Sequence, residues 1–334
     1  MKSLRTTLRT IVLAVAGLAA TLSATLTTAD RVLAQDWPDR PVRIIVPFPP
    51  GSSPDIVARL IGDQLTKNLQ KPFVVENKAG AGGMIGTDAI AKAAPDGTTI
   101  GVSITGPLVN NTLLYKKMAY DPFADLAPIT QAISQPCVLA ANKDFAASNI
   151  KEMIAELKSK PGRYNYGSLG NGTNAHLIME LIASKTSTQI VQVPYPGVGQ
   201  AVQALMTNDV QLGCLPPIGV IPQARAGKLK VIGVAAKSRS PLLSEYPTLA
   251  EQGLSGVEAN SWIGVVAPAK TPVPILTRIR VEIVRVLKDP EVARTLHTQF
   301  MEPVGSTPEE FAAYMKEELD RWGPLIKQNN ITVD

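Results

Sequence analysis

The sequence predicts an α/β protein of roughly two domains. Short apolar runs rich in Val and Ile alternate with amphipathic helical patterns from residue 42 to the C-terminus. Alternation of this kind is typical of β-α-β units, and it predicts a mainly parallel sheet flanked by helices. The chain has 334 residues, a length that provides roughly two domains, each with its own core.

The strands are predicted where β-branched residues form short runs bounded by turn residues. The predicted strands are 42–46, 72–77, 98–104, 136–142, 164–168, 190–194, 210–215, 229–236 and 259–267. No Gly/Ser-rich linker separates two halves of the chain, so we expect extended strand segments to cross the domain boundary.

The helices are predicted where apolar residues recur at helical spacing. They are 54–70, 84–93, 107–116, 148–159, 174–186, 198–208, 218–227, 273–288, 290–298 and 307–328. The last one opens with a capping box, Thr307 with Glu310 three residues on. Its apolar stripe, Phe311 to Trp322, is expected to pack in the core.

The N-terminus has the pattern of a secretory signal peptide. Lys2, Arg5 and Arg9 precede the apolar run from Ile11 to Leu22, and small residues follow. The run is shorter than the ~20 residues of a membrane-spanning helix. We therefore expect residues 1–34 to be a signal peptide, cleaved after Ala34 or, as a second choice, after Ala29, and the mature protein to be a soluble periplasmic one.

Charge and cysteine content exclude several classes of function. The leader carries +3 of the net charge of +5, so the mature chain has about +2 and no basic cluster, which argues against nucleic-acid binding. Cys137 and Cys214 lie in predicted strands, where two buried free thiols are favoured over a disulfide. Two Cys and two His without ligand spacing predict no metal site.

The segment VPFPPGSSPDIVARLI predicts a binding site at the start of a helix. A strand ends at Val46, a stiff Pro/Gly/Ser loop follows, and Ser53 is the expected N-cap, with Pro54 and Asp55 in the first turn. Free backbone N–H groups and the helix dipole favour an anion there, at the carboxyl end of a strand. An ordinary strand–helix turn explains the segment equally well.

Three further segments repeat this arrangement. A strand to Ser168 is followed by a Gly-rich loop and a helix capped by Thr173, and a strand to Val193 is followed by the loop 194–199. Ser103 lies at another strand end. These small, uncharged, hydrogen-bonding loops together predict a cleft for a small carboxylate-bearing molecule rather than for a polyanion.

Two alternatives carry less support. The loop with Gly80, Gly82, Gly83 and Gly86 does not fit G-x-G-x-x-G, since Ile85 stands in the place of the third Gly, so a dinucleotide cofactor is not expected. A periplasmic serine hydrolase would use Ser168 or Ser103, but the G-x-S-x-G elbow is missing.

The available histidines also weaken the hydrolase alternative. His297 lies in an amphipathic helix with ordinary surface character. His176 lies in the first turn of its helix, where the dipole lowers its basicity, and we interpret it as a neutral hydrogen-bonding or packed residue. We therefore predict that the protein is not an enzyme and uses no catalytic residues and no cofactor.

Motifs along nearly the whole mature chain resemble one family. The segments WPDRPVRIIVPFPPGSSPDIVARL, VVENKAGAGGMIGTDAIAKAAPDGTTIGVS, YNYGSLGNGTNAHL, VPYPGVGQAVQALMTNDVQL, AGKLKVIGVAAKSRSPLLSEYPTLAEQG and SWIGVVAPAKTP occur in order. Together they resemble the Bug-type substrate-binding proteins of tripartite tricarboxylate transporters. The resemblance implies a two-domain periplasmic binding protein of type II, a "Venus flytrap" with its ligand cleft between the domains.

The resemblance also implies a set of ligand-binding positions. Carried over by position, these are Phe48, Pro49, Gly51, Ser52, Ser53, Asp55, Ser103, Ser168, Gly172, Thr173, Asn174, His176, Pro196 and Gly197. The family usually has Gly and then Ala or Ser after the Pro-Gly step, where this chain has Ser52-Ser53-Pro54. The identity of the ligand therefore cannot be copied from a relative.

The resemblance finally implies a domain division and a partner. Domain 1 is expected to combine residues 35–135 with 258–334, and domain 2 to be residues 136–257. The expected role is that of a monomeric extracytoplasmic receptor, which delivers a small carboxylate to a membrane permease of two subunits. A sensor that presents the ligand to a signalling receptor is the alternative.

Overall fold

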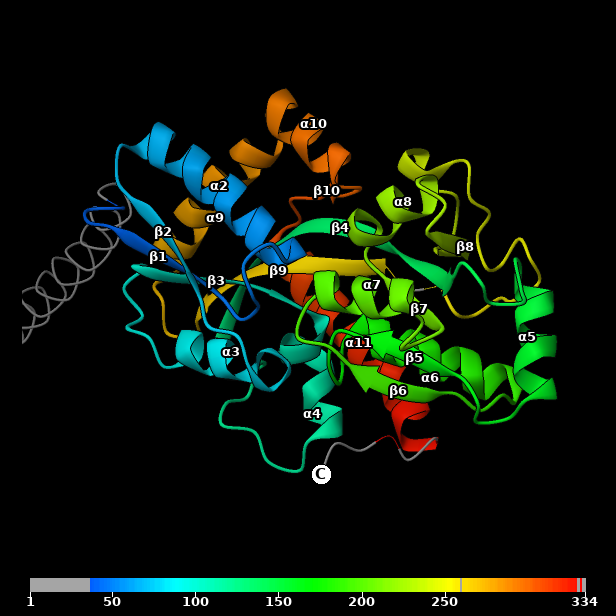
Figure 1. Ribbon diagram of the computed structural model, residues 1–334. Coiled ribbons are helices and arrows are strands. Elements are labelled where there is room, and N and C mark those ends of the chain that lie inside the picture. Colours follow the sequence, from blue (N-terminus) through cyan, green and yellow to red (C-terminus); the bar gives the residue numbers. More distant parts are fainter. Residues whose placement is uncertain (1–36, 259, 329–330, 332–334) are drawn as a thin grey trace, which may run out of the picture.

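The computed structural model describes residues 37–258, 260–328 and 331. The predicted signal peptide, residues 1–34, lies outside this range. The α/β class is confirmed: strands and helices alternate along the chain, and Figure 1 shows two lobes that meet at the long strands β4 and β9.

The strands form one continuous, strongly curled arrangement. Their order is β2-β1-β3-β9-β4-β7-β5-β6, with β8 and β10 also pairing with β4. The bounds are β1 (Val42–Val46), β2 (Phe73–Asn77), β3 (Thr99–Ile104), β4 (Leu126–Asn142), β5 (Asn165–Ser168), β6 (Val191–Pro194), β7 (Leu212–Leu215), β8 (Leu229–Ala235), β9 (Asn260–Pro268) and β10 (Glu302–Pro303).

The expectation of a mainly parallel sheet is wrong. Strands β1, β2 and β3 pair in parallel in one lobe, and β5, β6 and β7 do so in the other. Every pairing made by β4 and β9 is antiparallel. These two strands run between the lobes in opposite directions, so they place an antiparallel centre between two parallel wings.

Strand β4 is also longer than predicted. It begins at Leu126, ten residues before the predicted start, and its first half pairs with β9 while its second half pairs with β7 and β8. The register shifts between Pro128 and Thr130 and again between Gln131 and Ile133. These bulges and the polar residues between them hid the strand pattern in the sequence.

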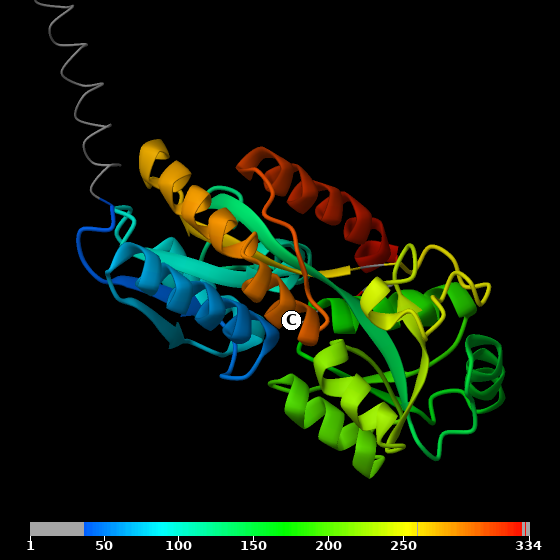
Figure 2. The ribbon, with the colours of Figure 1, turned by 90° about the horizontal axis from the view of Figure 1, so that it is seen from above.

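Helices cover both faces of each lobe (Figures 1 and 2). In the lobe of β1, the helices α2 and α9 pack on one face and α3 and α11 on the other. The bounds are α2 (Ser53–Leu69), α3 (Met84–Ala91), α4 (Asn111–Leu114), α5 (Ile150–Ser159), α6 (Asn174–Thr186), α7 (Val198–Thr207), α8 (Pro217–Arg225), α9 (Val273–Leu287), α10 (Pro290–Thr298) and α11 (Pro308–Gln328). Short turns η1 (Ala81–Gly83), η2 (Gly106–Asn110) and η3 (Pro241–Leu243) complete the set.

One predicted helix differs from the observed structure, and another begins as expected. The segment predicted as 107–116 is the π-helical turn η2 followed by the short α4. The capping box before α11 is confirmed, because the Thr307 amide donates to Glu310 Oε2 and the Glu310 amide donates to Thr307 Oγ1. Residues Phe311, Met315 and Trp322 of α11 are buried, as expected.

The far end of α11 packs on the second lobe. Trp322, Leu325 and Ile326 belong to the same apolar cluster as Leu177 and Ile182 of α6. Among the described residues, no helix combines the length and the apolar character that a membrane crossing requires.

Candidate functional site

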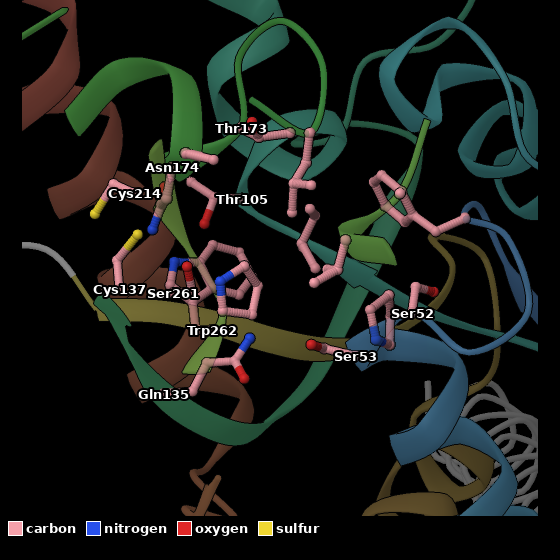
Figure 3. A pocket seen from close by; sticks show the side chains of 18 of the residues that line it. Ser52, Ser53, Thr105, Gln135, Cys137, Thr173, Asn174, Cys214, Ser261 and Trp262 are labelled. Atoms are coloured by element: carbon pink, nitrogen blue, oxygen red, sulfur yellow. The ribbon is translucent and has the colours of Figure 1, made fainter. Parts of the chain in front are cut away.

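A cavity lies between the two lobes, at the point where β4 and β9 pass from one to the other (Figure 3). It encloses about 60 Å³ of space for the centres of water-sized molecules. One water needs ~10–15 Å³ by this measure, so the cavity has room for a few waters or a small organic molecule. Its lining comes from both lobes: Phe48, Ser52, Ser53, Pro54, Ile104, Thr105, Gln135, Cys137, Leu169, Thr173, Asn174, Ala175, Pro196, Gly197, Val198, Cys214, Pro216, Ser261 and Trp262.

Four helices begin at this cavity. The first residues of α2, α6 and α7 line it, and so does Pro216, the residue before α8. The N–H groups of a first helical turn have no acceptor within their own helix, and the dipole adds a partial positive charge at this end. The four helix starts thus surround the cavity with a positive potential, although none of its lining residues carries a formal charge.

The loop before α2 is fixed by its own hydrogen bonds. The structure places the N-cap at Ser52 rather than at the predicted Ser53, and the helix begins at Ser53. Ser52 Oγ donates to the Pro49 carbonyl at 2.7 Å, so it holds the turn and does not cap the helix. This frees Ser53, whose side chain lies at the cavity wall.

Asp55 anchors this loop from behind. Its carboxylate accepts from the Gly51 amide at 2.9 Å, from Asn77 Nδ2 at 2.9 Å and from Arg59 Nε at 3.0 Å. Burial opposes ionisation, but the hydrogen bonds from Arg59, Gly51 and Asn77 together outweigh it and lower the pKa of this carboxyl group. The ionised Asp55 carboxylate therefore stabilises the loop from inside the protein, and it does not line the cavity.

The loop before α6 is closed by a similar set of bonds in the second lobe. Thr173 Oγ1 donates to the Gly170 carbonyl at 2.7 Å, and the Gly172 amide donates to His176 Nδ1 at 3.2 Å. The Gly172 carbonyl accepts from Asn110 Nδ2 of η2 at 2.8 Å. This last bond ties the loop to a segment that follows β3 of the other lobe.

His176 supports the loop as a neutral ring. Burial lowers the pKa of His176 to about 4, so the ring is uncharged at neutral pH and Nδ1 is free to accept. The sequence indicated reduced basicity from the helix dipole, whereas burial is the dominant cause. His176 does not line the cavity, and its bond to Gly172 makes it a positioning residue.

Four residues that line the cavity have a buried polar side-chain atom without a hydrogen-bond partner among the described residues. These atoms are Ser53 Oγ, Gln135 Oε1, Asn174 Oδ1 and Trp262 Nε1. A buried polar atom without a partner costs about 1–3 kcal/mol. Asn174 is otherwise anchored, because its Nδ2 donates to the Asn260 carbonyl of β9 at 2.9 Å. These atoms are the clearest structural indication that a polar solute completes the site.

Seven of the predicted site residues line the cavity and seven do not. The lining ones are Phe48, Ser52, Ser53, Thr173, Asn174, Pro196 and Gly197. Pro49 lines a second, more open hollow next to it. Gly51, Asp55, Gly172 and His176 support the two loops, as described above.

The two remaining predicted residues are serines. Ser103 is fully buried and does not line the cavity. Ser168 Oγ accepts from Gln192 Nε2 at 2.7 Å and from the Gly170 amide at 3.3 Å, and neither bond involves a histidine.

The structure adds lining residues that sequence reasoning missed. Half of them come from strands: Ile104 of β3, Gln135 and Cys137 of β4, Cys214 of β7, and Ser261 and Trp262 of β9. The Cys pair and the Ser-Trp step were visible in the sequence, but which face of each strand points to the cleft depends on register. Among the described residues, no three His, Cys, Asp or Glu side chains come close enough to hold a metal ion.

Comparison with known proteins places this site in a family context. The model of the tripartite tricarboxylate transporter family receptor, TctC, matches residues 57–331. Protein BugT of Bordetella pertussis is 34% identical over 306 residues, which span 91% of this chain and 94% of that protein.

Solved structures with bound acids match the fold. R. palustris Rpa4515 with adipate superposes with a TM-score of 0.85 at 31% identity, covering 89% of this chain and all of the other. MatC (Rpa3494) from Rhodopseudomonas palustris with bound malate gives 0.81 at 32% identity, covering 87% and 100%. The fold is thus that of a two-domain periplasmic binding protein, and the matched proteins are solute-binding receptors rather than enzymes.

Proposed function

The chain belongs to the tripartite tricarboxylate transporter family of receptors, and from this premise we propose that it binds a small carboxylate-bearing solute in the cavity between its lobes. Receptors of this family are periplasmic. We propose that this chain reaches the periplasm through a signal peptide at residues 1–34, and that it delivers its solute as a monomer to a two-subunit membrane permease.

The observation that carries the proposal is the uncharged cavity surrounded by helix starts. A carboxylate placed there accepts charge-assisted bonds from backbone N–H groups and from hydroxyls such as Ser53 Oγ, each contributing ~1.5–3 kcal/mol. Micromolar affinity requires about 8 kcal/mol, so a handful of such bonds, less the cost of closing the lobes, is sufficient. Two structural relatives hold adipate and malate, both of which are dicarboxylates.

The two-lobe architecture supports a flytrap mechanism. We assign residues 35–135 and 258–334 to domain 1 and residues 136–257 to domain 2, with β4 and β9 as the two crossings. The proposed ligand-binding set combines the seven lining residues predicted from the sequence with Gln135, Ser261 and Trp262. Gly51, Asp55, Gly172, Ser168 and His176 are proposed to position the loops.

The ligand class is tested by a thermal-shift screen of small carboxylates. Each acid is paired with its amide or methyl ester, because a solute that binds only the folded protein raises Tm. We expect acids to stabilise the protein and their neutral partners not to. Equal stabilisation by the amides would show that the helix starts do not select a carboxylate.

Two variants test the loop before α2. Ser53→Ala removes a buried hydroxyl that has no partner among the described residues, so it should lower affinity for the best acid about five- to tenfold and should not lower Tm of the free protein. Gly51→Val should also weaken binding, because Gly51 has φ +78° and a β-branched residue there shifts the loop. Unchanged affinity in Ser53→Ala would contradict the proposed carboxylate position.

The transport role is tested in the cell. Deletion of the gene should abolish uptake of the acid found in the screen. Retained uptake together with loss of a transcriptional response to that acid would instead indicate a sensor.

A further inference from the structure

The two cysteines of the chain lie side by side in the wall of the cavity. Cys214 of β7 is paired with Leu139 of β4 in an antiparallel register, and Cys137 lies two residues before Leu139. Residues two apart on a strand share a face, so both thiols point to the same side of the sheet. Figure 3 shows the two sulfur atoms next to each other at the cavity end opposite Ser52 and Ser53.

The thiols are buried, and they lie in the wall of the cavity. Both residues are free and buried, and both line the cavity. The chain contains no other cysteine, so each thiol is the other's sole intramolecular partner. Burial and the hydrogen-bonded thiol of Cys214 raise the pKa of Cys137 well above its usual range, which slows the reaction of the Cys137 thiol while it stays buried.

We propose that Cys137 and Cys214 are a reversible oxidation site inside the ligand cavity, where disulfide formation and solute binding exclude each other. The inference rests on the proposed function, since it adds a control on the same cavity. The oxidant is a small disulfide, R–S–S–R, of the kind present in an oxidising compartment.

The reaction balances as two thiol–disulfide exchanges. One cysteine thiolate attacks the small disulfide, forms a mixed disulfide and releases R–S⁻, which takes up the proton that the cysteine lost. The second cysteine then attacks the mixed disulfide and releases the second R–SH. The protein loses two protons and two electrons, and the small disulfide gains both and becomes two thiols.

The consequence for binding follows from geometry. Bonded sulfurs are ~2.05 Å apart, whereas thiols in contact are separated by nearly twice that distance. Cys137 and Cys214 are diagonal neighbours on paired strands, so the bond draws their side chains together across the ladder and shifts β4 along β7 in the wall. Strand β4 continues from Cys137 to Gln135, whose side chain also lines the cavity. Oxidation therefore changes the shape of the site, and a bound solute in turn blocks access of the oxidant to the thiols.

The test uses bis(2-hydroxyethyl) disulfide as the oxidant and intact-mass measurement as the readout. In the solute-free protein we expect a mass loss of two hydrogens, reversed by dithiothreitol. Adipate, or an acid with a larger thermal shift, should slow this oxidation at saturating concentration. The oxidised protein should bind that acid at least about tenfold more weakly, a change of ~1.4 kcal/mol.

Single variants provide the control. Cys214→Ala and Cys137→Ala each retain one thiol, so they form at most a mixed disulfide and never lose two hydrogens. The proposal is overturned if the solute-free wild-type protein keeps both thiols, if saturating acid leaves the oxidation rate unchanged, or if the oxidised protein binds as well as the reduced one. If no acid binds the reduced protein, the proposed function is wrong. The mass of the solute-free protein after treatment with the oxidant still shows whether Cys137 and Cys214 form a disulfide.

Discussion

At the scale of single residues, His176 links the stability of the binding loop to pH. The residue is 5% exposed, and its Nδ1 accepts a hydrogen bond from the Gly172 amide just before α6. Because burial lowers its pKa from 6.5 to about 4, the unfolded chain takes up a proton on this side chain at a higher pH than the folded chain does. The contribution of neutral His176 is therefore fully present above pH 6.5 and is lost as pH falls toward about 4.

This predicts a specific pH dependence of unfolding. Between about pH 6.5 and pH 4, His176 should account for a loss of roughly 3 kcal/mol in the free energy of unfolding. His176→Asn keeps an acceptor for Gly172 and does not titrate there, so its urea-unfolding free energy should fall less over the same range. The matched control is His297→Asn, because His297 is exposed and its Nε2 lies 3.1 Å from the exposed Glu302 carboxylate. Parallel curves for wild type and His176→Asn would contradict the assignment.

Residue types were easier to predict than residue positions. The composition of the loops indicated a neutral site of amides and hydroxyls, and Ser53, Thr173 and Asn174 do line the cavity. Asp55 was predicted from the same motif, yet its carboxylate faces Arg59 and Asn77. Adjacent residues of one motif point to opposite sides of a helix start, and only tertiary packing decides which one faces the ligand.

At the scale of secondary-structure elements, the glycine before α6 allows the loop to fit against α4. Gly172 has φ +75°, and a Cβ at this position would lie 2.4 Å from Asn111 Oδ1 and 2.9 Å from Leu114 Cδ1. Both partners are buried, so neither has room to move aside. A side chain at position 172 is thus disfavoured for two independent reasons: the left-handed backbone conformation, and the clash of a Cβ with Asn111 and Leu114.

The two reasons can be separated experimentally. Gly172→Ala should lose stability from both, whereas Gly227→Ala should lose only the ~1 kcal/mol of the left-handed backbone, since Gly227 has φ +70° and open space around it. We expect the unfolding free energy to drop at least twice as much in Gly172→Ala as in Gly227→Ala. Gly172→Ala should also lower affinity for the acid of the screen, because the loop leads directly to Thr173 and Asn174. Equal costs for the two variants would show that the contact with Asn111 is unimportant.

Most elements were predictable from local patterns, and the exceptions have a physical reason. The bounds of α6 and α10 agree with the sequence prediction, as does β1, since caps and turn residues mark them. The first half of β4 was missed, because its bulges break the alternation that identifies a strand. The antiparallel centre of the sheet depends on pairing between residues more than 100 positions apart, which no local pattern contains.

At the scale of the whole molecule, the two lobes touch at glycines on the rim of the cavity. A Cβ on Gly170 of the second lobe would lie 3.8 Å from the Cα of Gly82 in the first. Both glycines line the hollow that adjoins the ligand cavity and shares Phe48, Leu169 and Pro196 with it. Because neither glycine has a side chain, the backbones of the two lobes can approach closely at this rim around a bound solute.

This contact predicts that a disulfide can lock the lobes together. In a disulfide, Cα atoms are ~4.4–6.8 Å apart, and the 3.8 Å between a Cβ on Gly170 and Gly82 Cα is short enough for Gly82→Cys and Gly170→Cys to be joined in one chain. Both positions have positive φ, so each cysteine costs at least ~1 kcal/mol in backbone strain, and the reduced double variant is the reference that carries the same strain. Cys137 and Cys214 are replaced by Ala in the same protein, so that only the new pair reacts. If the lobes must separate to release the solute, oxidation after loading should slow dissociation of the bound acid at least about tenfold, and oxidation before loading should slow its association.

The lock has an internal control, since reduction with dithiothreitol should restore both rates in the same sample. The single variant Gly82→Cys should be insensitive to oxidant, which separates the effect of the cross-link from that of the substitution. Stopped-flow fluorescence or surface plasmon resonance provides the rates. A cross-linked protein that still exchanges its acid as fast as the reduced one would show that the solute enters without separation at this rim, and the flytrap mechanism proposed for β4 and β9 would then be wrong.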